Sequence, residues 1–201
     1  MNPEEAGINK ITKDSAFRRM IVSKMKGEYI MLDKRVAELL NEQINKEFYS
    51  AYLYLDFAVF YEELGLDGFQ NWYEIQAQEE RDHALLFLKY LQNNGGKVSL
   101  GAIAMPDKEL KDKKDPLVFA LEHEQYVTSL INDIYEAAYN VKDFRTMQFL
   151  DWFVKEQGEE EKNAEDMIKK MDLFGDDAKS LYMLNSEMLG RVYAAPSLVL
   201  D

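Results

Sequence analysis

The chain has 201 residues, 47% hydrophobic and 30% charged, a composition typical of a globular protein with one sizeable core or two small ones. It contains no cysteine, which excludes disulfides, thiolate zinc sites, iron–sulfur clusters and a thiol nucleophile, and which fits a cytoplasmic protein. The formal net charge of −13 makes nucleic acid an unexpected partner and cations expected ones.

The first 30 residues differ from the rest because they are basic within an acidic chain and carry few, weakly periodic apolar residues. We interpret residues 1–30 as an N-terminal extension of unknown role and residues 31–201 as the folded unit. The extension is alternatively a tag, or an upstream start ahead of Met20, Met25 or Met31. No signal peptide is expected, because charges alternate through this segment. No membrane partner is expected either, because no apolar run approaches the roughly 18 residues of a membrane span.

A long amphipathic helix is predicted over residues 32–64. Its inward stripe repeats at intervals of four and three residues, and a carboxylate, Glu47, interrupts the stripe in its centre. The stripe comprises Leu40, Ile44, Glu47, Ala51, Tyr54 and Ala58. Gly65 is predicted to end this helix and Asp67 to cap the next. The short connection indicates that the two helices are antiparallel neighbours.

The second predicted helix, residues 67–94, has a stripe that is apolar at both ends and polar in the middle. The stripe comprises Phe69, Tyr73, Gln76, Glu80, His83, Phe87 and Tyr90. Glu80 and His83 place an oxygen and a nitrogen ligand on adjacent turns, and a carboxylate on a core face is costly unless it is paired or bound to a metal. For one helix alone, a glutamate hydrogen-bonded to a buried histidine is the simpler explanation.

After Gly95-Gly96, about twenty residues without a clear pattern lead to Asp115-Pro116, an unusually long loop. The second helix would be about 42 Å long, and twenty extended residues reach at most about 66 Å. The loop can therefore return along the bundle and start the third helix parallel to the second. Short hairpins on either side of one long crossover form a known four-helix topology.

Two further helices follow, each with polar residues in the middle of an apolar stripe. Asp115 and Pro116 are predicted as N-cap and first residue of the third helix. Its stripe comprises Leu117, Ala120, Glu124, Val127, Ile131, Ile134 and Ala138. After a break at 140–143, the stripe of the fourth comprises Thr146, Leu150, Phe153, Gln157, Glu160, Ala164, Met167 and Met171. Gly175 is predicted to end the fourth helix. A short fifth helix is predicted over residues 176–191, where it would cap the bundle or contact another subunit.

Each of the four long helices thus presents a carboxylate near the middle of its buried face. Four buried carboxylates cannot stay ionised together without cations, because like charges at short range raise pKa values steeply. Two bound metal ions would neutralise them, and oxygen-rich ligands with one imidazole suit iron or manganese better than a closed zinc site. The alternative is a proton-sharing carboxylate network that only fixes the register of the helices.

Four segments carry a resemblance to bacterial non-haem ferritins that extends over about residues 32–196. They are Asn41–Glu47, Gln78–His83, His123–Gln125 and Glu156–Lys162. The resemblance implies an all-α, ferritin-like four-helix bundle with a long crossover between its second and third helices and a short fifth helix. It also implies iron storage in a hollow cage of twenty-four identical subunits, with the fifth helix at the four-fold contacts.

The resemblance further implies a di-iron ferroxidase centre, in which Fe(II) is oxidised by dioxygen or peroxide. One iron would be held by Glu47, Glu80 and His83. The second would be held by Glu80 as a bridge, Glu124 and Glu160.

Other site residues are implied in the same way. Gln157 would lie beside the second iron, and Tyr54 would lie within hydrogen-bond reach of the centre, unless it is simply a core tyrosine. Glu79, Glu156 and Glu159 match a third, weaker iron site, for which a solvated acidic face is the alternative.

The sequence also departs from related families. The fourth helix has Gln157 and Glu160 where a symmetric di-iron bundle has a second Glu-x-x-His, which makes the second site poorer in nitrogen. Arg81 stands where the haem-ligating methionine of bacterioferritin would be, so no haem is expected. His123 is not an expected ligand, because it lies about 100° from Glu124 around the helix. A discrete di-iron oxidoreductase without mineral storage, using the same ligands, remains the alternative function.

Overall fold

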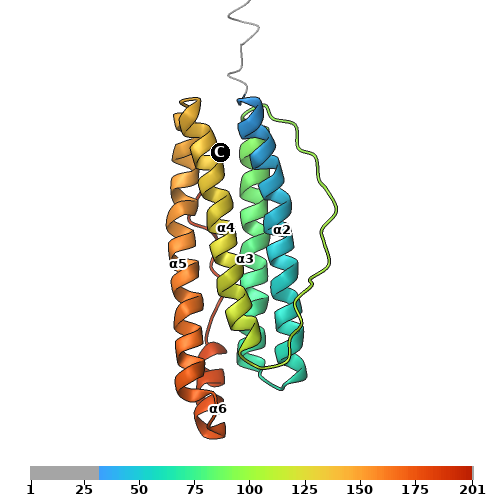
Figure 1. Ribbon diagram of the computed structural model, residues 1–201, viewed down its shortest axis with the longest axis vertical. Coiled ribbons are helices and arrows are strands. Elements are labelled where there is room, and N and C mark those ends of the chain that lie inside the picture. The colour runs from blue at the N-terminus through green and yellow to red at the C-terminus, as the bar shows by residue number, and fades with distance from the viewer. Residues whose placement is uncertain (1–31, 201) are drawn as a thin grey trace, which may run out of the picture.

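The computed structural model describes residues 32–200, so the predicted extension, residues 1–30, lies outside the described part of the chain. Within that part, four long helices form an elongated bundle, and a short helix lies at one end of it (Figure 1). The helices are α2 (Lys34–Glu63), α3 (Asp67–Asn93), α4 (Asp115–Asn140), α5 (Phe144–Phe174) and α6 (Ala178–Met188). The predicted all-α bundle with a short fifth helix is therefore confirmed. None of the described helices is long and apolar enough to cross a membrane.

The helices end where the sequence provides caps and glycines. The Asp33 carboxylate accepts hydrogen bonds from the first turn of α2, and Asp143 does the same for α5. Gly65, just beyond α2, has a φ of +70°, and Gly95, just beyond α3, has a φ of +76°. These left-handed conformations favour glycine, because a side chain there is strained. Both predicted helix ends are confirmed.

Two predicted caps are wrong by one residue. Leu66, not Asp67, precedes the first residue of α3, and no side chain caps this end. Likewise Lys114 is the N-cap of α4, while the Asp115 carboxylate accepts the backbone N–H groups of Lys111 and Asp112, both at 2.8 Å. Asp115 therefore closes the preceding turn, and a negative charge in the first turn still suits the helix dipole.

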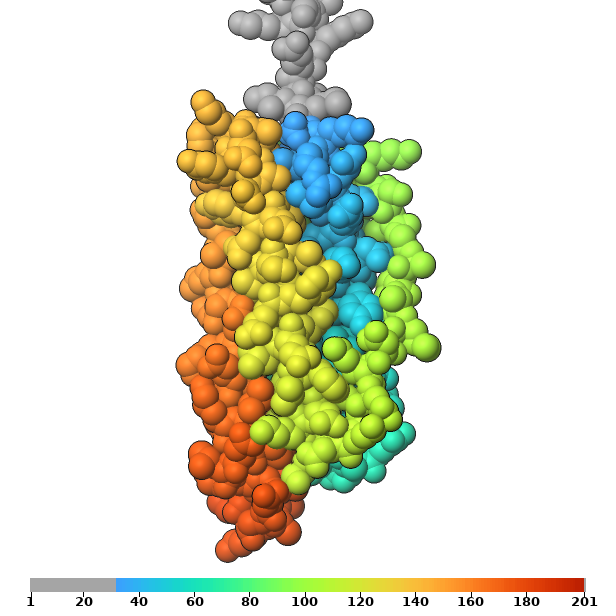
Figure 2. All heavy atoms as spheres, in the orientation of Figure 1, coloured from blue at the N-terminus to red at the C-terminus, as the bar shows by residue number. Residues whose placement is uncertain are grey.

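The long segment between α3 and α4, residues 94–114, returns along the outside of α2 and sets α4 parallel to α3 (Figure 1). Figure 2 shows the crossover lying against the blue flank of α2. Asn41 accepts a hydrogen bond from Ser99 N–H at 2.7 Å and donates one to the Ser99 carbonyl at 2.9 Å. Farther along, the Tyr61 hydroxyl donates to the Lys113 carbonyl at 2.7 Å. The predicted crossover is confirmed.

The apolar core consists of two clusters, one toward each end of the bundle. The first, nearer α6, is built around Tyr61, Phe69 and Leu117. The second, near the opposite end, is built around Phe87 and Phe153. Between them lies a layer of buried polar side chains contributed by all four long helices.

After α6 the chain turns back along the bundle (Figure 1). Arg191 contacts α3 first, and then the Tyr193 hydroxyl donates to Asp82 at 2.5 Å. Farther on, Trp152 Nε1 donates to the Ser197 hydroxyl at 2.9 Å. We call residues 189–200 the C-terminal segment. It contacts α3 and α5 along its length.

Candidate metal centre

The buried polar layer contains the ligands predicted for the two metal ions. All of these side chains are at most 8% exposed: Glu47 from α2, Glu80 and His83 from α3, Glu124 from α4, and Gln157 and Glu160 from α5. Each lies in the interior because it occupies an inward position of an otherwise apolar helical stripe. Four helices thus place five ionisable groups in one layer of the core.

Glu47, Glu80 and His83 form the tightest group in this layer. Each offers a ligand atom, and these atoms all lie within 4.8 Å of one another. His83 Nδ1 lies 3.5 Å from Glu80 Oε2, and Gln43 Nε2 donates to Glu47 Oε1 at 2.8 Å. The second Glu47 oxygen is buried and has no hydrogen-bond partner among the described residues. Because an unpaired buried oxygen is costly, a cation fits this group.

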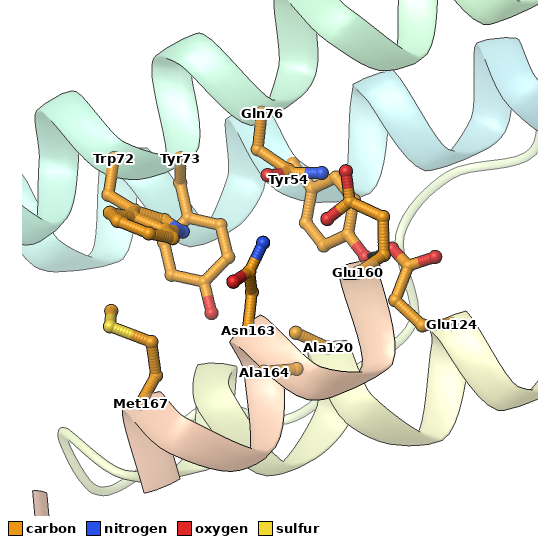
Figure 3. A pocket seen from close by; sticks show the side chains of 10 residues that line it. All are labelled: Tyr54, Trp72, Tyr73, Gln76, Ala120, Glu124, Glu160, Asn163, Ala164 and Met167. Atoms are coloured by element: carbon orange, nitrogen blue, oxygen red, sulfur yellow. Dashed lines mark hydrogen bonds between the residues drawn. The ribbon is translucent and has the colours of Figure 1, made fainter. Parts of the chain in front are cut away.

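The second half of the layer is joined by hydrogen bonds between side chains. The Tyr54 hydroxyl donates to one oxygen of Glu124, and Gln157 Nε2 donates to the other at 3.0 Å. Figure 3 shows Tyr54, Glu124 and Glu160 side by side around a small cavity. The cavity volume is about 20 Å³, and one water molecule requires about 10–15 Å³ on this measure.

Burial sets the protonation of most carboxyl groups in the layer. Burial, together with the charge of Glu80, raises the pKa of Glu47 to about 8 and that of Glu160 to about 7. The same two causes raise the pKa of Glu124 well above its usual range. Glu47 and Glu124 therefore hold protons at neutral pH, and Glu160 is about half protonated; a bound metal ion would displace these protons.

Glu80 and His83 behave in the opposite way, because they neutralise each other. Burial raises the pKa of Glu80, but the adjacent His83 outweighs burial, and the net pKa is lowered. Burial lowers the pKa of His83, but the hydrogen bond and charge of Glu80 prevail and raise it to about 10. An ion pair at the centre of the layer thus coexists with protonated carboxyl groups around it.

His123, which was not an expected ligand, belongs to a different set of contacts. Its Nε2 lies 2.8 Å from the Ser50 hydroxyl, and its ring packs against that of Tyr49. Burial lowers the pKa of His123 to about 4, so it is neutral at physiological pH.

The residues predicted for a third site lie beside this layer and closer to solvent. Glu79 is 16% exposed and pairs with Arg191 at 2.5 Å. Burial raises the pKa of Glu156, and the charge of Glu159 adds to the effect. Glu159 itself is exposed and pairs with Lys155 at 3.1 Å.

Sequence reasoning assigned no role to three side chains that contact the ligands. Gln43 lies one turn before Glu47, and Gln76 lies one turn before Glu80 and donates to it at 3.2 Å. A glutamine four residues before a buried glutamate is a signal that the sequence offers. Arg191 is more than 100 residues from Glu79 along the chain, and nothing in the sequence pairs them.

An all-α bundle with a carboxylate–histidine group in its centre defines the class of ferritin-like metal-binding bundles. A family model described as a ferritin-like domain matches residues 37–174. A bacterial non-heme ferritin from Campylobacter jejuni is 39% identical over 153 residues, which cover 76% of this chain and 92% of that protein. A probable bacterial non-heme ferritin-like protein from Haemophilus influenzae is 34% identical over 79% of this chain and 96% of its own length.

Solved structures agree with these relatives. An open pore ferritin from Archaeoglobus fulgidus is 40% identical, with a TM-score of 0.78 over 80% of this chain and 98% of that one. An engineered closed form of the same ferritin has a TM-score of 0.79 over 81% of this chain and 99% of that one. The chain belongs to the ferritin family, so iron storage is its function and iron oxidation its chemistry. The resemblance to bacterial non-haem ferritins is confirmed.

Proposed function

We propose that two Fe(II) ions bind as substrates within the buried layer and are oxidised there before the ferric product is stored. Glu47, Glu80 and His83 would hold the first ion. Glu80, as a bridge, would hold the second together with Glu124 and Glu160. Each turnover removes one electron from each ion. Dioxygen takes up the two electrons and two protons to form hydrogen peroxide, and peroxide as oxidant takes up the same number to form water.

The single observation that carries this proposal is the group of Glu47, Glu80 and His83. Three potential ligand atoms lie within 4.8 Å of one another, and the free oxygen of Glu47 has no partner among the described residues. Raised pKa values of Glu47 and Glu160 add a source of protons, because metal binding releases them into the site. The layer therefore has both the donors that Fe(II) accepts and protons that the reduced oxidant consumes.

Small inorganic substrates are favoured over an organic one by the space beside the ligands. The cavity bordered by Tyr54, Glu124 and Glu160 has a volume of about 20 Å³, whereas pockets for organic ligands typically measure about 300–1,000 Å³. This favours storage over a discrete di-iron oxidoreductase acting on an organic substrate.

Two neighbours of the second ion have distinct proposed roles. Gln157, whose amide N–H donates to Glu124 at 3.0 Å, would orient that ligand and the oxidant. Tyr54, whose hydroxyl donates to the other oxygen of Glu124, would supply a proton or hold the carboxylate in place. We also propose that Glu79, Glu156 and Glu159 form a weaker third iron site, with Glu79 and Glu156 as its main ligands.

Assembly and compartment complete the proposal. A cage of twenty-four identical subunits would supply the hollow for the ferric mineral, as the family resemblance implies. The cysteine-free chain fits the cytoplasm. Residues 1–30 would form an extension outside the ferritin unit.

The test is stepwise aerobic addition of Fe(II) to the full chain, well past two ions per subunit, followed by separation by size and an iron assay. We expect iron to co-elute with a very large particle far beyond the di-iron stoichiometry. Glu47→Ala combined with His83→Ala should abolish rapid oxidation. The matched control, Glu62→Ala with Glu74→Ala, removes exposed carboxylates from the same two helices and should leave the rate unchanged.

Two results would contradict the proposal. Iron uptake that stops near two ions per subunit would indicate a discrete di-iron enzyme. Full-speed oxidation by the Glu47→Ala, His83→Ala variant would show that the buried group is not the site of oxidation.

A further inference from the structure

Arg191, in the C-terminal segment, reaches from the end of the chain into the edge of the metal centre. Its guanidinium donates to Gln76 Oε1 at 2.9 Å, to the Trp72 carbonyl at 3.1 Å and to Glu79 Oε2 at 2.5 Å. The group also stacks over the Trp72 ring, 4.2 Å from its centroid. Its side chain is 16% exposed. Four contacts hold the guanidinium in one position.

The contact with Gln76 determines which way that amide points. A guanidinium only donates hydrogen bonds, so the carbonyl oxygen of Gln76 must face Arg191. The amide nitrogen then faces the interior, where it donates to Glu80 Oε1 at 3.2 Å. Figure 3 shows the Gln76 side chain directed toward Glu160. Without Arg191, the amide would lose its second partner and only its hydrogen bonds to the carboxylates would hold it.

The contact with Glu79 connects Arg191 to the proposed third site. Glu79 directly precedes Glu80 in α3. Burial raises the pKa of Glu79, and the nearby charge of Glu156 adds to this effect. A charge-assisted hydrogen bond of this kind is stronger than a neutral one. A cation that binds at Glu79 would therefore compete with the guanidinium for this carboxylate.

We propose that Arg191 is a positioning residue that couples Glu79 to the bridging carboxylate Glu80 through the amide of Gln76. The inference rests on the two-metal centre and third site of the proposed function. With Arg191 in place, Gln76 donates to Glu80 and fixes the oxygens that would hold both metal ions. A cation at Glu79 displaces Arg191, releases Gln76 and loosens that ligand. Binding of a cation at the third site thus lowers the affinity of the centre for its two metal ions.

Zn(II), which does not change oxidation state, is the probe, and calorimetry counts its binding steps. Arg191→Met keeps the stem that packs on Trp72 but removes the charge and every donor, while Arg191→Lys keeps the charge. Tyr193→Phe is the matched control, because it removes another contact of the same segment, with Asp82. All variants carry Trp152→Phe, which leaves Trp72 as the one tryptophan of the two in the chain.

We expect Arg191→Met to weaken the first two Zn(II) steps about tenfold, as the loss of a partner behind a ligand does. It should strengthen the third step about tenfold, because a competing charge is gone. Arg191→Lys should keep both affinities close to those of the chain with Arg191 intact. Tyr193→Phe should change neither affinity. Emission from Trp72 should shift at the third step when Arg191 is present and stay constant in Arg191→Met.

A purely structural role would not weaken the first two Zn(II) steps and strengthen the third. If Arg191→Met and Tyr193→Phe weaken every step equally, Arg191 only docks the segment and the proposal is overturned. An unchanged or absent third step in Arg191→Met overturns it as well. If the chain with Arg191 intact fails to bind the first two Zn(II) ions, the proposed metal centre fails instead.

Discussion

The two halves of the buried layer differ in how they are prepared for a metal ion. Around Glu47, Glu80 and His83, one carboxylate is already ionised beside a charged histidine, and one oxygen of Glu47 has no partner among the described residues. Around Glu124 and Glu160, the carboxyl groups hold protons, and Tyr54 and Gln157 occupy both oxygens of Glu124.

Because of this difference, we do not expect the two halves to bind metal ions with the same strength. In the first half a metal ion replaces the protons on His83 and Glu47 and gains an oxygen of Glu47 that has no partner among the described residues. In the second half it replaces the proton on Glu124 and must also compete with two hydrogen bonds to that carboxyl group. We therefore expect the first half to fill first and the second to be more labile.

The largest effect is expected from Glu80→Gln, because Glu80 lies between the two halves. Its charge raises the pKa of Glu47, Glu124 and Glu160 alike. The variant should lose binding of both ions, and Fe(II) oxidation should fall at least about 100-fold, since even partners behind a ligand are worth about 10–100-fold. Stopped-flow absorbance would measure the rate. Retention of both Zn(II) steps by calorimetry would show that Glu80 is not a bridge.

A smaller and one-sided effect is expected from Glu124→Gln. The second metal ion should bind at least about tenfold more weakly, while the affinity for the first should stay unchanged, because Glu124 is outside the group of atoms that lie within 4.8 Å. Calorimetry with Zn(II) separates the two steps. Equal weakening of both steps would contradict the division into halves.

The metal-free protein should become less stable as pH rises. The folded chain keeps protons on Glu47 up to about pH 8 and on Glu160 up to about pH 7, whereas the unfolded chain releases them near 4.5. His83 acts in the same direction, since its folded pKa of about 10 exceeds its usual 6.5. Between pH 5 and 8 the free energy of unfolding should fall by about 1.4 kcal/mol per pH unit for each extra proton held by the folded state.

Denaturant unfolding after chelation, repeated at several pH values, would measure this slope. Glu47→Gln removes one of the titrating groups and should give a shallower slope. A stability that rises between pH 5 and 8 in the unsubstituted chain would contradict protonation of the buried carboxyl groups.

The smallest effect is expected from Tyr54→Phe. The variant loses one hydrogen bond to Glu124 and should lose about 1 kcal/mol of stability. Without that donor the pKa of Glu124 rises further, since the Tyr54 hydroxyl lowers it, so the second ion should bind less well at low pH. Oxidation should slow by less than about tenfold. A loss above about 100-fold would make Tyr54 a direct participant in the reaction.

Helix order and the buried ligands were predictable because both depend on periodicity within one helix. Glu47, Glu80 and Glu124 each interrupt an apolar stripe, and such an interruption is visible in the sequence. The crossover was predictable from its length alone. The caps at Asp67 and Asp115 failed because each aspartate is the first residue of its helix and not the residue before it. Helix boundaries shift by one or two residues more easily than the helices themselves.

Contacts made by the C-terminal segment could not be predicted. Arg191 meets Glu79 and Gln76 only because α6 ends where it does and the chain then turns back along the bundle. No periodic pattern encodes such a path, since the segment has no regular secondary structure. The difference in protonation between the two halves was hidden for a similar reason, because it depends on distances between side chains of different helices.

The polar layer between the two apolar clusters has a consequence for how the molecule opens. Packing around Phe69 and packing around Phe87 are separate, so neither cluster directly stabilises the other. Without metal, the two ends of the bundle are units that can exchange their amide hydrogens at different rates. We expect an ion held by ligands from α2, α3, α4 and α5 to tie the two units together. Loading with iron should therefore make the opening of the two ends more cooperative.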